Sequence, residues 1–177
     1  MKRYLPEGAQ IVVTETEIET ALDHMAEQVQ TRFEGKELLM LTVLNGGMIP
    51  ASLLALRLKL PLEMDYLHAS RYRGEAGGDK LTWHARPRAP MTGRHILVVD
   101  DILDEGPTLQ AIVEYCREQG ASSVVSAVLV EKCHDRRVAG AHADIVGVKV
   151  EDRYVFGFGM DYRGGLRHLP QVYALAS

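Results

Sequence analysis

The chain has 177 residues, of which 46% are hydrophobic and 25% charged, so it is long enough for one domain with a buried core and lacks the composition of a disordered protein. Its 20 lysines and arginines are outnumbered by 24 aspartates and glutamates, and the net charge of −4 argues against binding to nucleic acid. No segment resembles a signal peptide or approaches the roughly 18 apolar residues of a membrane span, and two cysteines without CxxC spacing fit a reducing compartment, so we expect a cytoplasmic protein that binds no membrane.

The first predicted elements are a helix and a buried strand. Thr14 followed three residues later by Glu17 has the pattern of a capping box, and apolar residues then recur at helical spacing until Gly35. Residues 38–44, LLMLTVL, form a short continuous apolar run. Such a run predicts a strand that is buried on both faces.

A glycine turn and a polar segment follow this strand. The turn at Asn45-Gly46-Gly47 leads into a second predicted helix that runs through Leu58. Residues 62–67 alternate well enough for another strand. Residues 70–80, SRYRGEAGGDK, are polar and rich in glycine, which is typical of a mobile lid or a hairpin loop.

The second half of the chain alternates strands with a helix. Apolar runs predict strands over residues 95–99, 124–130, 145–150 and 154–158, a helix over 108–119 that stops at Gly120, and a last segment, 172–175, that closes the sheet. Strands that alternate with helices imply an α/β fold with a mainly parallel, twisted sheet flanked by helices on both faces.

The strongest functional signal is the segment from Val98 to Leu109, VVDDILDEGPTL. A buried strand ends at Asp100 and Asp101, and a helix starts just after Gly106. Ligands of open α/β sheets bind at strand ends, and a helix N-terminus offers unpaired N–H groups to a phosphate, here beside residues 106–109. Carboxylates suit sugar hydroxyls or a hard cation such as Mg²⁺. One segment therefore predicts contacts with a sugar, a metal and a phosphate.

This segment resembles the diphosphoribosyl-binding motif of the type I phosphoribosyltransferases, in which a buried strand meets two acids, two apolar residues, a third acid and a glycine-threonine turn. The resemblance implies that Asp100 and Asp101 hold the ribose hydroxyls and that Asp104 acts as general base or acid toward a purine ring nitrogen. It also implies a 5′-phosphate site made of Asp104, Glu105, Gly106, Pro107, Thr108 and Leu109. Two positions depart from the family pattern, because Glu105 replaces a threonine or serine and Pro107 removes one backbone donor.

Two glycine-rich or polar segments extend the resemblance to the 6-oxopurine branch, the hypoxanthine-guanine phosphoribosyltransferases. Leu44-Asn45-Gly46-Gly47 resembles the pyrophosphate loop, which in the family has a non-proline cis peptide before its second residue. Ser70-Arg71-Tyr72 stands where the family's mobile catalytic lid carries a Ser-Tyr pair. Tyr72 matches the tyrosine and would be catalytic, Arg71 replaces the serine, and Ser70 would contact substrate. A plain glycine turn and a solvated loop are the alternative interpretations of these two segments.

The rest of the resemblance lies in the last third of the chain. Lys132 corresponds to the lysine that donates to the O6 atom of the purine, Tyr154 to the aromatic residue that stacks on the base, and Val155 to the residue whose backbone contacts its pyrimidine edge. Asp161 corresponds to a magnesium contact, together with Asp100 and Asp101. Arg167 corresponds to a pyrophosphate contact.

The resemblance implies an enzyme of purine salvage. Its substrates would be Mg²⁺-bound phosphoribosyl diphosphate and hypoxanthine or guanine, and its products pyrophosphate and IMP or GMP. The family also implies a homodimer or homotetramer and a single domain, with a core over about residues 36–150 and a small hood from residues 1–15 and 151–177.

Three alternatives remain open at this level. A regulator could use the same site to sense phosphoribosyl diphosphate, although the acidic balance of the chain argues against control of nucleic acid. A phosphoribosyltransferase for xanthine or a pyrimidine could use Lys132 and Tyr154 in the same way. A phosphoacceptor receiver domain also has acids after a buried strand, but it should carry an acceptor aspartate after residues 124–130, where Glu131-Lys132 stands.

Overall fold

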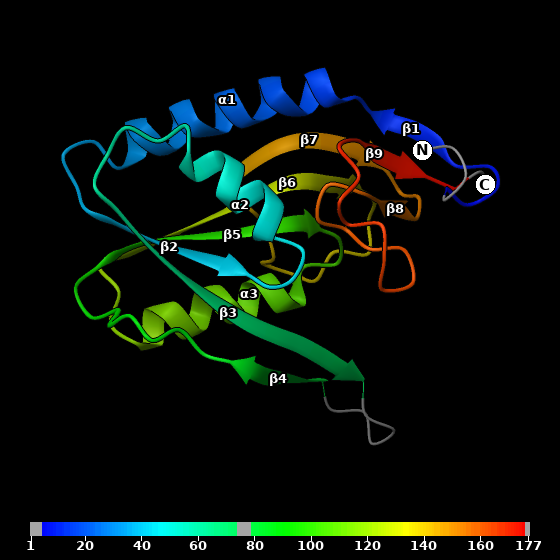
Figure 1. The fold of residues 1–177 in the computed structure, drawn as a ribbon. Helices are drawn as coiled ribbons and strands as arrows, with labels where there is room; N and C mark the ends of the chain where they lie inside the picture. The colour runs from blue at the N-terminus through cyan, green and yellow to red at the C-terminus, as the bar shows by residue number, and fades with distance from the viewer. Residues whose placement is uncertain (1–4, 74–78, 176–177) are drawn as a thin grey trace.

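The computed structural model of the protein describes residues 5–73 and 79–175 (Figure 1). In chain order the elements are β1 (Gln10–Val13), α1 (Glu15–Arg32), β2 (Leu38–Val43), α2 (Met48–Ala55), β3 (Leu62–Arg73), β4 (Asp79–Ala85), β5 (His95–Leu103), α3 (Pro107–Glu118), β6 (Ser123–Cys133), β7 (Ile145–Glu151), β8 (Val155–Phe156) and β9 (Val172–Ala174). Within the described residues, no helix is both long and apolar enough to cross a membrane.

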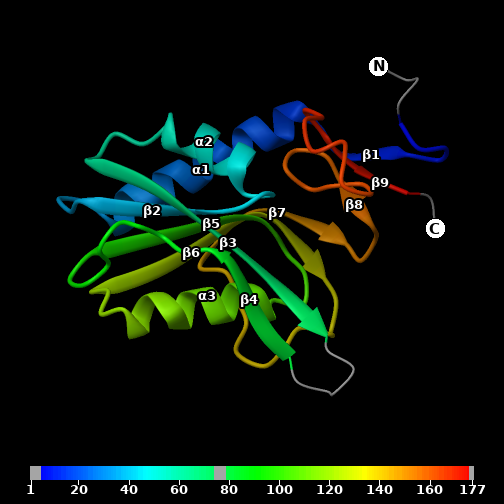
Figure 2. The same ribbon diagram turned by 60° about the horizontal axis from the view of Figure 1, so that its bottom comes forward.

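The main sheet has six strands in the order β4-β3-β2-β5-β6-β7. All neighbours pair in parallel except β3 and β4, which form an antiparallel hairpin. Helices α1 and α2 cover one face of this sheet and α3 covers the other, as Figures 1 and 2 show from two directions. The predicted fold class, a mainly parallel twisted sheet flanked by helices, is confirmed.

Helix α1 begins where the capping box predicts. The Thr14 hydroxyl accepts a hydrogen bond from the Glu17 amide at 3.3 Å, and the Glu17 carboxylate accepts one from the Thr14 amide at 2.8 Å. These reciprocal bonds satisfy two amide groups at the start of the helix. The helix buries one apolar stripe, made of Ile18, Ala21, Leu22, Met25, Ala26 and Val29, against the sheet.

The apolar core lies in two layers, one on each side of the sheet. Every residue of β2 is buried, which agrees with the prediction from its continuous apolar run. Because successive side chains of a strand point to opposite faces, Met40 packs in the layer beneath α1 and α2, while Leu39 and Leu41 pack in the layer beneath α3. Burial on both faces fixes the register of the central strands.

Several strands are longer than their apolar runs predict. β3 continues through the polar residues up to Arg73, β5 continues through Asp100 and Asp101 to Leu103, and β6 includes Glu131 and Lys132. The hairpin expected around residues 70–80 is formed by β3 and β4, although β4 itself was not predicted as a strand. The pairing runs from His68 opposite Ala85 to Arg73 opposite Asp79. Pairing satisfies the backbone groups of polar residues as well as of apolar ones, so these strands extend beyond the hydrophobic pattern.

A second, three-stranded sheet lies beyond the carboxyl ends of the central strands (Figure 1). Its order is β1-β9-β8, so it joins residues 10–13 to residues 155–156 through residues 172–174. The prediction that residues 172–175 close the main sheet is therefore wrong. A short apolar run shows that a strand can form but does not show which strand it pairs with.

Candidate active site

A cleft of about 410 Å³ opens at the carboxyl ends of the parallel strands. It is lined by the β2–α2 turn, by the segment from the end of β5 into α3, and by one arginine from the loop before β9. Of the predicted site residues, the cleft brings together Leu44, Asn45, Gly46, Asp100, Asp101, Asp104, Glu105, Gly106, Pro107, Thr108, Leu109 and Arg167. This is the position where parallel α/β sheets bind ligands.

Asp100 and Asp101 lie in the last part of β5. The Asp101 side chain is buried, with 8% of the residue exposed, and Asp100 is partly buried. Burial, followed by the neighbouring charge of Asp101, raises the pKa of Asp100, and burial also raises the pKa of Asp101. Arg167 Nη1 lies 4.0 Å from Asp101 Oδ2. The pair is therefore a desolvated acidic site that favours hydroxyl donors or a cation.

The β2–α2 turn packs directly on the Asp101 carboxylate. A Cβ atom on Gly46 would overlap the Asp101 carboxylate, and one on Gly159 would overlap the Gly46 carbonyl oxygen. The peptide between Leu44 and Asn45 is cis, as the resemblance to the pyrophosphate loop implies. Both glycines are needed because the turn packs against the Asp101 side chain at Gly46, and the backbone of Gly46 packs against Gly159, without room for a further side chain.

The predicted phosphate site lies at the start of α3. Gly106 is the N-cap, with a φ of 86°, and supplies no side chain to the first amides of the helix. Pro107 occupies the first helical turn, where the missing N–H removes no intrahelical hydrogen bond. The amides that follow remain available to an anion. Glu105, the second departure from the family pattern, has its Oε1 atom 3.9 Å from Arg136 Nε, which offsets the added negative charge.

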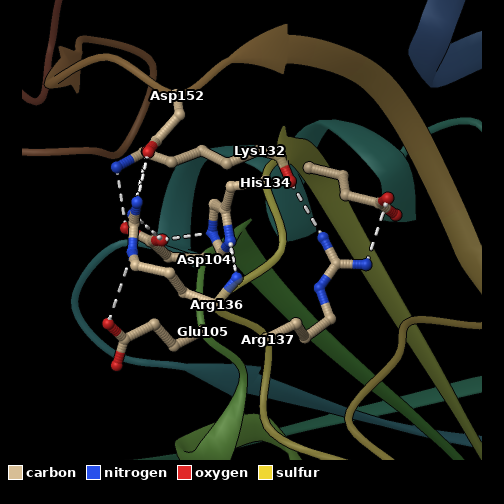
Figure 3. Close-up of polar contacts among 8 residues, drawn as sticks. Asp104, Glu105, Lys132, His134, Arg136, Arg137 and Asp152 are labelled. Atoms are coloured by element: carbon tan, nitrogen blue, oxygen red, sulfur yellow. Dashed lines mark hydrogen bonds and ion pairs between the residues drawn. The ribbon is translucent and has the colours of Figure 1, made fainter.

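Asp104 is held by two cationic or potentially cationic side chains (Figure 3). Lys132 Nζ donates to Oδ2 at 2.7 Å, and His134 Nε2 lies 2.8 Å from Oδ1. Burial raises the pKa of Asp104, but the hydrogen bonds from Lys132 and His134 and the charge of Lys132 outweigh it and hold this pKa below its ordinary value. Asp104 is therefore ionised at neutral pH and able to accept a proton.

Sequence reasoning missed His134, Arg136 and Asp152, which surround Asp104 in Figure 3. Arg136 forms a bidentate ion pair with Asp152, with distances of 2.5 and 3.0 Å. A usable signal was present, because His134 stands two residues after Lys132 and alternate residues of an extended segment point to the same side.

The residues predicted to hold the base lie beside the cleft rather than on its lining. Tyr154 is 51% exposed, and its hydroxyl donates to the Asp161 carbonyl oxygen at 3.1 Å. Val155 is buried and pairs with Ala174 in the small sheet. Two residues that line the cleft contact the neighbourhood of these residues. Asp104 accepts a hydrogen bond from Lys132, and Arg167 donates one to Asp161.

Arg167 joins the loop before β9 to the cleft. Its guanidinium donates to Asp161 Oδ1 at 2.8 Å and to the Gly159 carbonyl oxygen at 2.6 Å. The other oxygen of Asp161 accepts from the Gly164 amide at 2.9 Å. Each oxygen of Asp161 thus accepts one hydrogen bond. Within the described residues, the donor atoms of Asp161, Asp100 and Asp101 do not all lie within 4.8 Å of one another.

Among the described residues, three donor atoms close enough to surround one ion come instead from Asp104, His134 and Asp152, within 4.8 Å of one another. Lys132 already forms an ion pair with Asp104, and Arg136 forms one with Asp152. This group is therefore neutralised by side chains of the protein itself.

The predicted lid belongs to the β3–β4 hairpin. Ser70 Oγ and His84 Nε2 are 2.7 Å apart across the two strands, and Ser70 does not line the cleft, although the adjacent Ala69 does. The side chains of Arg71 and Tyr72 lie outside the described part of the structure, so the catalytic role of Tyr72 stays a prediction.

Comparison with known proteins agrees with this geometry. Residues 11–163 match the family of the phosphoribosyl transferase domain. The chain is 29% identical to the hypoxanthine-guanine phosphoribosyltransferase of Staphylococcus aureus, over 92% of this chain and 91% of that protein. It is 31% identical to the bifunctional protein TilS/HprT of Listeria monocytogenes over 92% of this chain, which spans 25% of that longer protein.

Solved structures show the same similarity. A hypoxanthine phosphoribosyltransferase from Staphylococcus aureus superposes with a TM-score of 0.88 at 28% identity, covering 94% of this chain and 91% of that one. The Trypanosoma cruzi hypoxanthine phosphoribosyltransferase, solved as a variant with the product IMP, gives a TM-score of 0.87 at 25% identity, covering 97% and 93%. These matches overturn the alternative of a receiver domain. The chain belongs to the phosphoribosyl transferase domain family.

Proposed function

We propose that this protein is a 6-oxopurine phosphoribosyltransferase of purine salvage. It transfers the phosphoribosyl group of phosphoribosyl diphosphate to hypoxanthine or guanine, forms IMP or GMP, and releases pyrophosphate. The observation that carries the proposal is the pairing of Asp104 with Lys132 at the rim of a cleft that also holds two buried acids and a helix N-terminus.

The cleft suits the ribose phosphate. The carboxylates of Asp100 and Asp101 accept hydrogen bonds from the ribose hydroxyls, and the amides at the start of α3 bind the 5′-phosphate. The β2–α2 turn and Arg167 border the same cleft and bind the diphosphate that leaves. A guanidinium stabilises the negative charge that develops on this leaving group.

The residues present fit a magnesium ion bound together with the substrate. Mg²⁺ in proteins is commonly held by one or two carboxylates plus substrate phosphates, and the buried pair Asp100 and Asp101 supplies two carboxylates in a desolvated position. The chemistry that bound Mg²⁺ supplies is neutralisation of diphosphate charge. Each oxygen of Asp161 already accepts one hydrogen bond, from Arg167 or from Gly164, so a contact of Asp161 with the ion would use the remaining lone pairs of these oxygens.

The base lies between Tyr154 and the pair of Asp104 and Lys132. The exposed ring of Tyr154 offers a stacking surface, which for a nucleobase is worth about 1 to 3 kcal/mol. Lys132 donates to the exocyclic oxygen, and the Val155 backbone contacts the pyrimidine edge. Asp104, ionised because Lys132 and His134 lower its pKa, accepts the proton of the purine nitrogen as the bond to ribose forms.

The remaining parts of the proposal concern organisation. The β3–β4 hairpin, with Ser70 and Tyr72, acts as the lid that shields the cationic ribosyl transition state from water. The sheet β1-β9-β8 forms a hood over the core of a single domain. The family resemblance supports a cytoplasmic homodimer or homotetramer.

The test is a comparison of bases. The protein is incubated with Mg²⁺, phosphoribosyl diphosphate and each of hypoxanthine, guanine, xanthine, adenine and uracil, and nucleotide formation is followed by absorbance. We expect turnover with hypoxanthine or guanine that stops when Mg²⁺ is chelated. Turnover with xanthine or uracil alone would change the proposed substrate, and binding of phosphoribosyl diphosphate without turnover of any base would favour a sensor.

A further inference from the structure

His134 makes a close contact with Asp104. Its Nε2 atom lies 2.8 Å from Asp104 Oδ1, while Lys132 holds the other oxygen, Oδ2, at 2.7 Å. Only 4% of the His134 side chain is exposed. The Asp104 side chain is itself 42% exposed, so water can reach the carboxylate, but each of its oxygens has a protein donor.

The neighbours of His134 determine which ring nitrogen carries the proton. The Arg136 amide lies 3.1 Å from His134 Nδ1. A backbone amide can only donate, so Nδ1 has to accept and carries no proton. The neutral ring then has its proton on Nε2, which donates to Asp104. Such a second bond on the far nitrogen is the usual way in which proteins fix a histidine tautomer.

Arg136 is itself held in place. Its guanidinium forms the bidentate ion pair with Asp152, which lies in the turn between β7 and β8 two residues before Tyr154 (Figure 3). A bidentate pair fixes orientation as well as distance. The contacts therefore run without interruption from the turn that precedes the stacking tyrosine to the carboxylate in front of α3.

We propose that Asp152, Arg136 and His134 form a positioning chain that fixes the orientation of the Asp104 carboxylate toward the purine. This inference rests on the proposed function. Each carboxylate oxygen has two lone-pair sites. With Nε2–H on Oδ1 and Lys132 on Oδ2, the carboxylate cannot rotate without breaking both bonds, and its free lone pairs keep one direction for the proton of the base.

The charges around the chain favour an ionised Asp104. Lys132 and Arg136 face it, with Arg136 Nη2 3.9 Å from Oδ1, while Asp152 and Glu105 are paired with Arg136. Since the His134 hydrogen bond is one of the contacts that lower the pKa of Asp104, removal of the imidazole should raise that pKa. The acidic limb of the rate profile should then move to higher pH.

The experiment compares two variants with a control. His134→Leu removes the donor, and His134→Gln keeps an N–H near the position of Nε2. His24→Leu removes an exposed imidazole on α1, away from the site. We expect His134→Leu to lower kcat by about 10-fold, to shift the acidic limb upward, and to leave KM for phosphoribosyl diphosphate unchanged. His134→Gln should recover most of the rate and the original profile.

A second measurement does not depend on activity. Nitrogen-15 NMR of the imidazole rings at about pH 8, above the ordinary pKa of histidine, should show His134 with an unprotonated Nδ1 and a protonated Nε2. His134→Leu supplies the assignment of the signal if it folds, and His134→Gln supplies it otherwise.

Two results would overturn the positioning chain: an unchanged kcat and pH profile in His134→Leu, or a proton on Nδ1 of His134 in the unaltered protein. If the unaltered protein makes no nucleotide from any base, the proposed function fails instead. The NMR result then still decides whether the contacts from Arg136 to Asp104 exist.

Discussion

Lys132 and Asp104 are 28 residues apart in the chain and are joined by a hydrogen bond of 2.7 Å between Nζ and Oδ2. Asp104 stands in the loop between β5 and α3, and Lys132 stands near the end of β6. The parallel pairing of β5 with β6 brings these two ends to the same edge of the sheet. The proposed proton acceptor and the proposed O6 donor therefore form one unit.

Replacing Asp104 with asparagine should remove the proton acceptor and keep the shape of the side chain. We expect Asp104→Asn to lower the rate of nucleotide formation by about 10² to 10⁴. Circular dichroism should be unchanged, because the amide oxygen still accepts from Lys132 or His134. Near-normal turnover would remove Asp104 from the mechanism.

Replacing Lys132 with methionine should weaken binding of the base more than binding of phosphoribosyl diphosphate. The variant keeps the apolar stem and loses the ammonium group, so KM for hypoxanthine should rise by about 10-fold, the cost of one charge-assisted hydrogen bond. Lys149→Met is the matched control, since that side chain is 66% exposed on β7. Equal effects on both substrates would contradict the assignment of Lys132 to the base.

The close approach of Gly46 to Asp101 predicts that Gly46→Ala is damaging. The added methyl group would overlap the Asp101 carboxylate and displace it, and small displacements of positioning groups can cost about 10²-fold in rate. Gly165→Ala is the control, because a Cβ there meets its nearest neighbour at an ordinary 3.7 Å. The steady-state rates of nucleotide formation by the two variants test this prediction. A fully active Gly46→Ala enzyme would show that the β2–α2 turn can shift to accept the methyl group.

The two cysteines should react very differently with thiol reagents. Cys116 is buried in α3, and burial raises its pKa to about 11, whereas Cys133 is exposed at the end of β6. Since the thiolate is the reactive form, a short treatment at about pH 8 should label one thiol in the folded protein and two in denaturant. Mass spectrometry of the labelled peptides should find Cys133 modified first, and early labelling of Cys116 would indicate local opening of α3.

Asp65 should contribute to stability in a manner that depends on pH. Partial burial raises its pKa, but three backbone amides, those of Tyr66, Arg88 and Ala89, donate to the carboxylate and lower the pKa overall. A lowered pKa in the fold means that the stabilisation is present above the unfolded value of 3.8 and is lost as the pH falls through the folded value.

We therefore expect Asp65→Asn to reduce the free energy of unfolding by about 1 kcal/mol at neutral pH, a small value because the site is only partly buried. The difference from the unaltered protein should vanish in strongly acidic solution. Urea unfolding of both proteins at neutral pH and in strongly acidic solution measures this difference in the free energy of unfolding. A difference that does not depend on pH would exclude ionisation of Asp65 as the cause.

The local pattern of the chain determined most of the elements. The capping box at Thr14 and the apolar stripe after it specify α1, and the apolar run of β2 is buried in full. The grouping of Asp100, Asp101 and the start of α3 in one cleft was also predictable, because these residues lie close together in the chain. They come together because β5 ends and α3 begins within the same short segment.

Tertiary structure decided the pairings between distant segments. The residues in and around 172–174 do not show which strands this segment pairs with. In the structure it pairs with β1 and β8 rather than with the main sheet. The environment of Asp104 was hidden for the same reason, since His134 is 30 residues away in the chain and Arg136 reaches a further partner at Asp152. A side chain's type and neighbours in the sequence limit what it can bind, but the donors that set its charge and orientation are chosen by the packing of the sheet.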